Sequence, residues 1–138
     1  MLAVTKSNSR RKMRKAFFTA DANQIRMFMS SRLSKDLRSS YGFKSFPVHS
    51  GDMVVVTTGK FKNKEGKVLS VSRKTRKVTV DGCTNAKASG GSIHYPIDAS
   101  NLIIKSLALD ESRKKSLESK KARVEAVRAK FEARAEKN

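Results

Sequence analysis

Three short runs rich in valine and threonine lie within residues 51–82, separated by turns rich in lysine, arginine and glycine. The three runs are residues 53–58, 67–72 and 77–81. Val54 and Val56 recur at a period of two, as do Val78 and Val80. Runs of this length and composition are typical of strands, and the alternation lets one face be buried while the other meets solvent. The segment therefore predicts three strands of a small barrel with cationic turns.

Two glycines bracket the turn between the first two runs. Gly59 precedes it and Gly66 opens the second run, and between them stand Lys60, Lys62 and Lys64. A glycine at each end suits a tight turn that needs positive φ or a close backbone approach. We therefore expect Gly59 and Gly66 to be structural, and a side chain at Gly66 to clash or to strain the turn.

Two more strands follow, at residues 93–97 and 102–107. Alternating apolar residues predict the first, and Pro96 favours an edge position because proline lacks the N–H that a ladder needs. The polar stretch at residues 83–92 reads as a loop. Five short strands in about 55 residues match the size of an SH3-like barrel, which is small enough to be marginally stable alone.

Helices are predicted on both sides of the barrel. Ser34 can cap a short helix from Lys35 to about Ser40, ended by a turn at Tyr41-Gly42. From Asp110 onward, apolar residues recur at spacings of three, four and seven among Ala, Glu, Lys and Arg. This pattern predicts one long helix or two shorter ones with a narrow apolar stripe, either solvated or lying along RNA phosphates.

The charge implies a partner with dense negative charge. The 31 Lys and Arg residues exceed the 12 Asp and Glu residues by 19, and residues 1–50 alone hold 11 basic and 2 acidic residues. Nucleic acid is the usual partner of such a chain. No apolar run approaches the ~20 residues of a membrane span, so no membrane insertion is expected. The single Cys83 fits a reducing, cytoplasmic or nuclear setting.

A basic run followed by two phenylalanines marks the N-terminal region. The run comprises Arg10, Arg11, Lys12, Arg14 and Lys15, with Phe17 and Phe18 after it. One reading is a disordered tail or a nuclear localisation signal. The other is an extended arm that becomes ordered only against RNA, with phosphates taking the charges.

Catalysis finds no support in the sequence. His49, His94 and Cys83 cannot be assembled convincingly into a zinc site or a nucleophile pair with an orienting group. Gly59-Lys60 lacks the other residues of a phosphate-binding P-loop. We therefore expect no enzyme activity, metal, cofactor or small-molecule substrate.

The barrel segment resembles a known RNA-binding module. A strand, a basic loop, Gly66-Lys67-Val68 and a second strand are similar to the KOW motif, whose fold is an SH3-like β-barrel. The flanking segments Leu33-Ser34-Lys35-Asp36-Leu37-Arg38 and Leu107-Ala108-Leu109-Asp110 extend the similarity over nearly the whole chain. Together they resemble eukaryotic large-subunit ribosomal protein twenty-six, of the universal ribosomal protein twenty-four family.

The resemblance implies a structural constituent of the large (60S-type) ribosomal subunit. Such a protein binds and helps to fold large-subunit rRNA near the peptide exit tunnel, beside neighbouring ribosomal proteins. It works in the cytoplasm, with assembly in the nucleus or nucleolus. The alternative is a KOW-type transcription-elongation factor or other nucleic-acid-binding factor, which would normally place a mixed α/β domain before the barrel. A protein-interaction module would need an aromatic groove or cage, for which Tyr41 and Tyr95 offer little.

The chain is thus predicted to be mainly β with helical extensions. Residues 1–46 form a basic N-terminal extension with a short helix, 47–108 a KOW/SH3-like barrel, and 109–138 a basic helical extension. RNA is expected to meet the cations of the arm, the barrel turns and the two helix starts. These are Arg10, Arg11, Lys12, Arg14, Lys15, Lys35, Arg38, Lys60, Lys62, Lys64, Lys67, Arg73, Lys74, Arg76, Lys77, Arg113 and Lys114.

Overall fold

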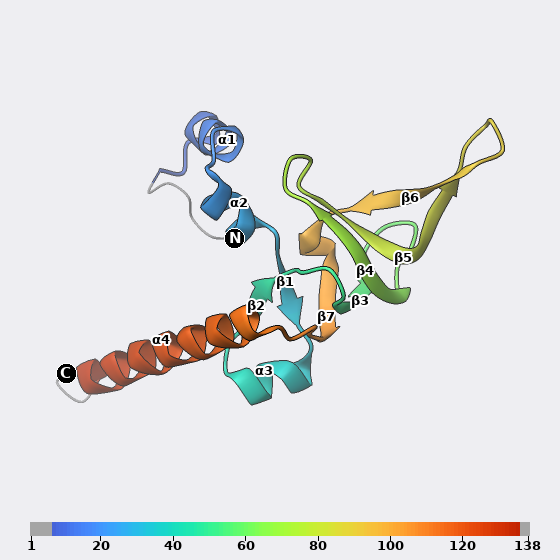
Figure 1. Cartoon of the computed structure of the whole chain (residues 1–138). Coiled ribbons are helices and arrows are strands. Elements are labelled where there is room, and N and C mark those ends of the chain that lie inside the picture. Colours follow the sequence, from blue (N-terminus) through green and yellow to red (C-terminus); the bar gives the residue numbers. More distant parts are fainter. Residues whose placement is uncertain (1–6, 136–138) are drawn as a thin grey trace.

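The computed structural model describes residues 7–135, in which a single curved sheet carries helices at its sides (Figure 1). The helices are α1 (Arg10–Phe18), α2 (Ala22–Phe28), α3 (Lys35–Tyr41), the 3-10 turn η1 (Ala99–Asn101) and α4 (Glu111–Ala135). The strands are β1 (Ser30–Leu33), β2 (Ser45–Pro47), β3 (Met53–Val56), β4 (Glu65–Ser72), β5 (Lys77–Ala86), β6 (Ser92–Ile97) and β7 (Leu102–Ser106). The outer ends of the two predicted extensions, residues 1–6 and 136–138, lie outside the described residues.

The sheet runs in the order β2-β1-β7-β3-β4-β5-β6. All neighbours are antiparallel except β1 and β7, which are parallel. The five predicted strands are confirmed as β3 to β7, and they are consecutive neighbours. β6, which contains Pro96, lies at an edge as expected. The predicted fold class, a small barrel-like β domain with a C-terminal helix, is confirmed.

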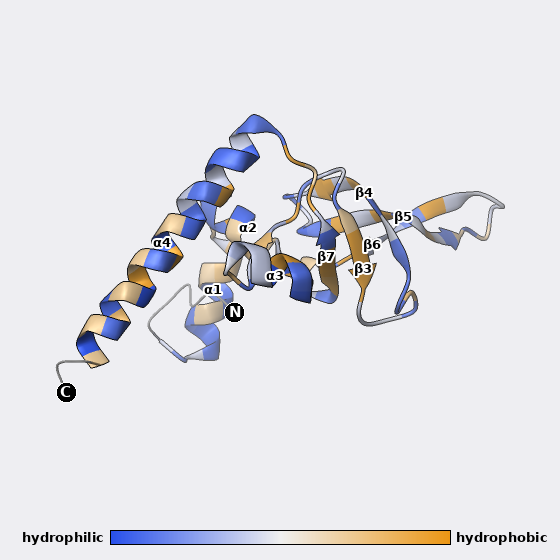
Figure 2. Ribbon diagram, turned by 90° about the horizontal axis from the view of Figure 1, so that it is seen from below, coloured by the Kyte–Doolittle hydropathy of each residue, from blue (hydrophilic) through white to orange (hydrophobic). Residues whose placement is uncertain are grey.

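The core is built from the alternating residues of these strands. Its completely buried apolar side chains include Val54, Val56, Val68, Val78, Val80, Leu102 and Ile104. Each lies on the inner face because successive side chains of a strand point to opposite sides. In Figure 2 the hydrophobic orange is prominent on β3 and β7, whereas α4 alternates between blue and orange along its length. Leu33 and Phe46 join the same core, so residues before the predicted barrel boundary at residue 47 also stabilise it.

The strands differ from the prediction in two respects. β1 and β2, with the sequences SSRL and SFP, were not predicted because they are short and lack apolar alternation; they form by pairing with each other and, for β1, with β7. β5 continues to Ala86 through the stretch predicted as a loop. Gly82 has φ +72 and the register with β6 shifts between Thr79 and Thr84, which allows the strand to bend and to continue. Cys83 is thereby completely buried, and burial raises the pKa of its thiol.

The predicted extended N-terminal arm is instead two short helices. Arg, Lys, Met and Ala in α1 all favour a helix. Asp21 begins α2, since its carboxylate accepts a hydrogen bond from the Gln24 N–H at 2.8 Å. The predicted short helix is confirmed as α3, where Ser34 accepts from the Leu37 N–H at 3.3 Å and Gly42 closes the helix with φ +76.

The C-terminal extension is one helix, which resolves the alternative of one or two. α4 starts beside the sheet and projects away from it (Figure 1). Leu117 is buried and Val124 packs partly against the core. Farther along, Arg128 donates to the Gly42 carbonyl at 2.9 Å, while Val127 and Phe131 are 50% and 68% exposed. The domain therefore holds the helix as far as Arg128.

A buried ion pair joins the start of α4 to the β2–β3 connection. The Asp52 carboxylate accepts from both terminal guanidinium nitrogens of Arg113 and from the backbone N–H groups of His49 (3.0 Å) and Ala108 (2.9 Å). Arg113 also donates to the carbonyls of Ala108 (2.9 Å) and Pro47 (3.1 Å). Both side chains are almost fully buried. Arg113, which was predicted to bind RNA, thus has its charge already paired inside the protein.

The structure gives Gly66 a different role from Gly59. Gly59 has φ +94, as the turn prediction required, whereas Gly66 lies outside the left-handed region. A Cβ at Gly66 would lie 2.6 Å from the Asp81 carbonyl oxygen and 2.8 Å from Val80 Cγ1. The close approach of two strands, rather than backbone conformation, therefore requires glycine here.

We expect Gly66→Val to lower the free energy of unfolding by about 1–3 kcal/mol, because a backbone oxygen in a paired strand cannot easily move away. Gly91→Val is the matched control, since a Cβ there would meet only Lys87 at 4.0 Å. Urea unfolding of both variants measures the difference. Equal losses would contradict the steric assignment.

Asp52→Ala should cost about 3–5 kcal/mol, because it leaves the Arg113 cation buried without a carboxylate. In the control Asp98→Ala, the lost partner is Lys77 in a half-exposed pair, which should cost at most about 1 kcal/mol. Chemical denaturation of the two variants is the measurement. Similar costs would show that the buried pair does not stabilise the fold.

Candidate nucleic-acid interface

The β3–β4 loop, residues 57–64, presents lysines from a rigid frame. Its ends are joined by backbone hydrogen bonds from Val56 N–H to the Lys64 carbonyl (2.9 Å) and from Asn63 N–H to the Val56 carbonyl (2.8 Å). Asn63 adopts φ +66, one of the few left-handed non-glycine positions among the described residues. The loop is therefore held in one conformation by its own backbone.

Two of its three lysines are oriented by neighbouring groups. The Lys60 ammonium donates to the side chain of Asn85 at 3.1 Å, and that of Lys64 donates to the Gly82 carbonyl. Both ammonium groups lie 5.7 Å from the centre of the Phe61 ring, a distance at which cation–π attraction operates. Lys62 is exposed, and its side chain makes no hydrogen bond or ion pair within residues 7–135.

The β4–β5 turn, residues 73–76, forms a second group of cations. Arg73 and Lys74 are exposed. Arg76 adopts φ +56, and its guanidinium carbon lies 3.9 Å from the centre of the Phe17 ring in α1. Lys77, just after the turn, pairs with Asp98 at 2.7 Å. Arg73 and Lys74 are thus the most available cations of this turn.

The stacking of Arg76 on Phe17 brings α1 to the β4–β5 turn. α1 carries five basic and no acidic residues over nine positions, and all five are exposed. Phe17 also packs on Phe28 of α2, with ring centres 5.6 Å apart. We call the exposed cations of α1 together with Arg73 and Lys74 the α1–turn surface. It unites two segments that lie far apart in the sequence.

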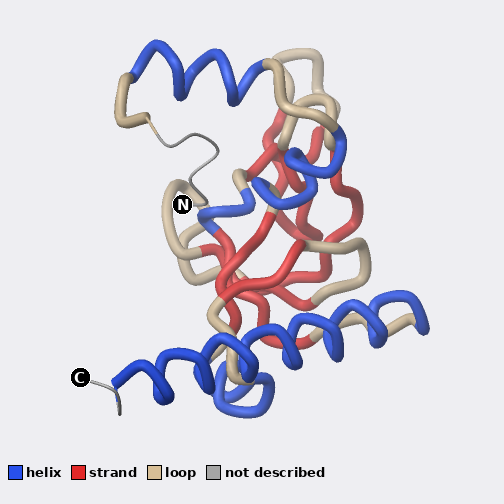
Figure 3. Tube along the Cα trace, turned by 90° about the vertical axis from the view of Figure 1, so that its left-hand side faces the viewer, coloured by secondary structure: helices blue, strands red, loops and turns tan. Residues whose placement is uncertain are grey.

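The predicted RNA-binding residues do not form one patch. The β3–β4 loop and the β4–β5 turn lie at opposite ends of β4, whose eight residues span about 26 Å. Lys35 and Arg38 lie on α3, at the opposite end of the molecule from α1 (Figure 3). Lys67 and Lys114 are exposed on β4 and at the start of α4. RNA would have to approach the domain from several sides.

A further set of cations was not predicted from the sequence. Arg26, Lys115, Lys120 and Arg123 line a common groove, but they come from two helices. Their spacing gives no signal, because α2 was not predicted and the position of α4 depends on the buried Arg113. Burial, with a smaller contribution from the nearby Arg123, lowers the pKa of Lys120.

Aromatic rings orient several of the surface cations. Phe61 lies beside Lys60 and Lys64, Phe17 beside Arg76, and Phe43 beside Lys120. Long basic side chains lose conformational entropy when they are fixed against a ligand, and a ring that already restricts them reduces that loss. A chain with a formal net charge of +19 thus keeps some of its cations ordered near polarisable surface instead of leaving them all in solvent.

Within residues 7–135, no three His, Cys, Asp or Glu side chains lie close enough together to share a metal ion. Over the same residues, no helix has both the length and the apolar character that a bilayer crossing requires. The described surface instead carries positively charged side chains on a rigid sheet.

Comparison with known proteins assigns a family to this arrangement. Residues 7–120 match the family described as ribosomal proteins L26 of eukaryotes and L24 of archaea. The chain is 42% identical over 119 residues to large ribosomal subunit protein uL24A of Saccharomyces cerevisiae, covering 86% of this chain and 94% of the relative. It is 41% identical over 132 residues to uL24 of Dictyostelium discoideum (96% and 95%). With uL24 of Methanosphaera stadtmanae it shares 40% identity over 108 residues (78% and 92%).

The contacts of Phe17 predict how firmly α1 is held. Phe17→Ala removes the stack with Arg76 and the packing on Phe28, together worth about 1–2 kcal/mol. We therefore expect amide exchange in residues 10–18 to accelerate about 5- to 30-fold, with no change in β3. Phe18→Ala should accelerate exchange less, because Phe18 is 64% exposed, meets Phe17 only edge-on at 5.4 Å and lies 5.7 Å from Arg76. If α1 exchanges equally fast in wild type and Phe17→Ala, the stack does not hold it.

Proposed function

The chain belongs to the family of ribosomal proteins L26 of eukaryotes and L24 of archaea, and on this premise we propose that it is a structural constituent of the large ribosomal subunit that binds large-subunit rRNA. The observation that supports rRNA binding best is the α1–turn surface, where exposed cations converge and α1 contributes no carboxylate. Such a surface is unfavourable in isolation, because like charges repel, and it becomes favourable against phosphates.

The protein works by neutralising phosphates at fixed positions. Each cation that meets a phosphate releases a counterion, and the rigid sheet sets the spacing at which RNA segments are held. The proposed contacts are the predicted residues that are exposed or half-buried, without the buried Arg113. They are Arg10, Arg11, Lys12, Arg14, Lys15, Lys35, Arg38, Lys60, Lys62, Lys64, Lys67, Arg73, Lys74, Arg76, Lys77 and Lys114.

The partners are rRNA and adjoining proteins of the large subunit, and the place of action is the ribosome. A position near the peptide exit tunnel and assembly in the nucleus or nucleolus follow from the family resemblance and stay predictions.

The alternative of a KOW-type transcription factor is not favoured. Such a factor would need a separate mixed α/β domain before the barrel, whereas β1 and β2 are strands of the same sheet as β3 to β7. The named relatives are ribosomal proteins, and their match to this chain covers 94% and 95% of their own length.

The test is the salt dependence of binding to large-subunit rRNA. Replacing Lys62, Arg73 and Lys74 by Gln should reduce the slope of log affinity against log salt by about 2 to 3, at roughly 0.7–0.9 per lost phosphate contact. The control replaces Lys121, Lys130 and Arg134 of α4 by Gln, which removes the same charge from exposed positions. Equal slope changes in the two variants would mean that net charge alone governs binding, and would contradict the proposed contacts.

A further inference from the structure

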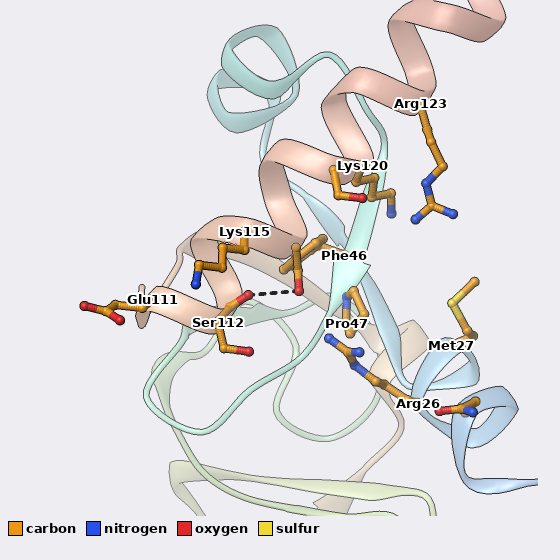
Figure 4. A pocket seen from close by; sticks show the side chains of 12 residues that line it. Arg26, Met27, Phe46, Pro47, Glu111, Ser112, Lys115, Lys120 and Arg123 are labelled. Carbon is orange, nitrogen blue, oxygen red and sulfur yellow. Dashed lines mark hydrogen bonds between the residues drawn. The ribbon is translucent and has the colours of Figure 1, made fainter.

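A groove of about 760 Å³ lies between α2, β2 and the first half of α4 (Figure 4). Arg26 and Met27 line it from α2, and Phe46 and Pro47 from β2. The α4 side contributes three cations and one carboxylate: Lys115, Lys120, Arg123 and Glu111. Four cations therefore share the groove with a single carboxylate. We call it the α2–α4 groove.

Most of these cations have no partner among the described residues. The side chains of Arg26, Lys115 and Arg123 make no hydrogen bond or ion pair with any other residue in 7–135, and all three residues are exposed. In Figure 4 the Arg123 side chain extends from α4 toward the α2 side, where Arg26 and Met27 lie. In the same view the Arg26 guanidinium points toward Pro47, so the two guanidinium groups lie at different places along the groove. An anion in the groove would offset the positive charge that gathers there.

Lys120 is held in place at the back of the groove. Its ammonium donates to the Ser45 carbonyl at 2.5 Å and lies 4.8 Å from the Phe43 ring centre and 5.5 Å from that of Phe46. The burial and the nearby Arg123 that lower its pKa make the charged form costly. A phosphate oxygen in the groove would favour the charged ammonium, because an opposite charge at short range offsets both effects.

The groove also offers apolar surface beside its charges. Met27 is 48% exposed at its rim and Pro47 is half-buried on its β2 side, whereas Phe46 is only 3% exposed and belongs to the core beneath. Its volume lies in the range of about 300–1,000 Å³ typical of clefts that hold small organic ligands, a class to which a nucleotide belongs. A duplex keeps its bases stacked inside and presents mainly phosphates and riboses, whereas a single strand presents a phosphate next to an unpaired base. The combination of unpaired cations and apolar surface fits the single strand.

A second groove runs from this site to the β4–β5 turn. It has a volume of about 630 Å³, and it shares Asn23, Arg26, Phe46, Pro47 and Ser112 with the first. Its far end reaches Arg73, a member of the α1–turn surface. A strand that left the α2–α4 groove would therefore meet another exposed cation along its path.

We propose that the α2–α4 groove binds a single-stranded segment of RNA, an inference that rests on the proposed function and assigns one site to it. Arg26, Lys120 and Arg123 contact its phosphates, and Met27 packs against a base or ribose. Arg123 lies just beyond residues 7–120, the part of the chain that matches the family.

The test compares Arg26→Gln/Arg123→Gln with a matched control in the full-length chain. The control, Lys121→Gln/Lys130→Gln, removes the same charge from exposed positions of α4 outside the groove. The probes are a short unstructured single-stranded RNA, a duplex RNA of the same length and a polyglutamate peptide. We expect the groove variant to bind the single strand about tenfold more weakly than the control does, with a salt slope smaller by about 1.4 for two lost contacts, and to change duplex binding no more than the control.

Three results would overturn the proposal: equal single-strand affinities of the groove and control variants, an equal loss for duplex and single strand, or a larger loss for polyglutamate than for RNA. The test is separate from that of the proposed function. If the groove variant behaves like its control while the Lys62, Arg73 and Lys74 variant still lowers the rRNA salt slope, only the groove assignment fails. If neither responds, both fail.

Discussion

The buried pair of Asp52 and Arg113 is the interaction on which the arrangement of the surfaces depends. Removing two charges from water is costly, and the cost is offset only where nearly every hydrogen-bonding atom finds a partner. Here the carboxylate accepts from a guanidinium and two backbone amides, and the guanidinium also reaches two carbonyls. The pair therefore stabilises one geometry strongly: the first turn of α4 lies against the loop that leads from β2 to β3.

The position of α4 against the β2–β3 loop also determines where the α2–α4 groove lies. Pro47 accepts from Arg113 and also lines the α2–α4 groove, while Phe46 lies under the guanidinium, 5.4 Å from ring centre to carbon. Lys115, Lys120 and Arg123 follow on α4, so their positions relative to α2 are set by a residue that is buried away from any RNA. The buried Arg113 thus determines where the surface cations of α4 lie, although Arg113 was itself predicted to be a surface cation.

The sequence was informative where a local pattern determines structure. The alternating valines identified the core strands, the two ends of α3 were visible in Ser34 and Gly42, and Gly66 signalled a tight approach. It was uninformative where contact with a distant segment determines the local structure. β1 forms because β7 lies beside it, the strand β5 continues past Gly82 because β6 pairs with it, and α1 and α2 replaced an expected extended arm. Arg113 resembles its basic neighbours in sequence, and only the Asp52 carboxylate, 61 residues away, makes it structural.

The separation of the charged surfaces determines what kind of RNA ligand the domain fits. The β3–β4 loop and the α1–turn surface stand about 26 Å apart along β4, with exposed β4 positions such as Lys67 between them. That distance exceeds the screening length of about 8 Å at physiological salt, so each surface attracts phosphates independently. An RNA that satisfied both at once must supply phosphates at a matching spacing, from one long helix or from two segments held together. The sheet thereby converts non-specific charge attraction into a constraint on RNA shape, which lets a small protein favour one folded form of a large RNA.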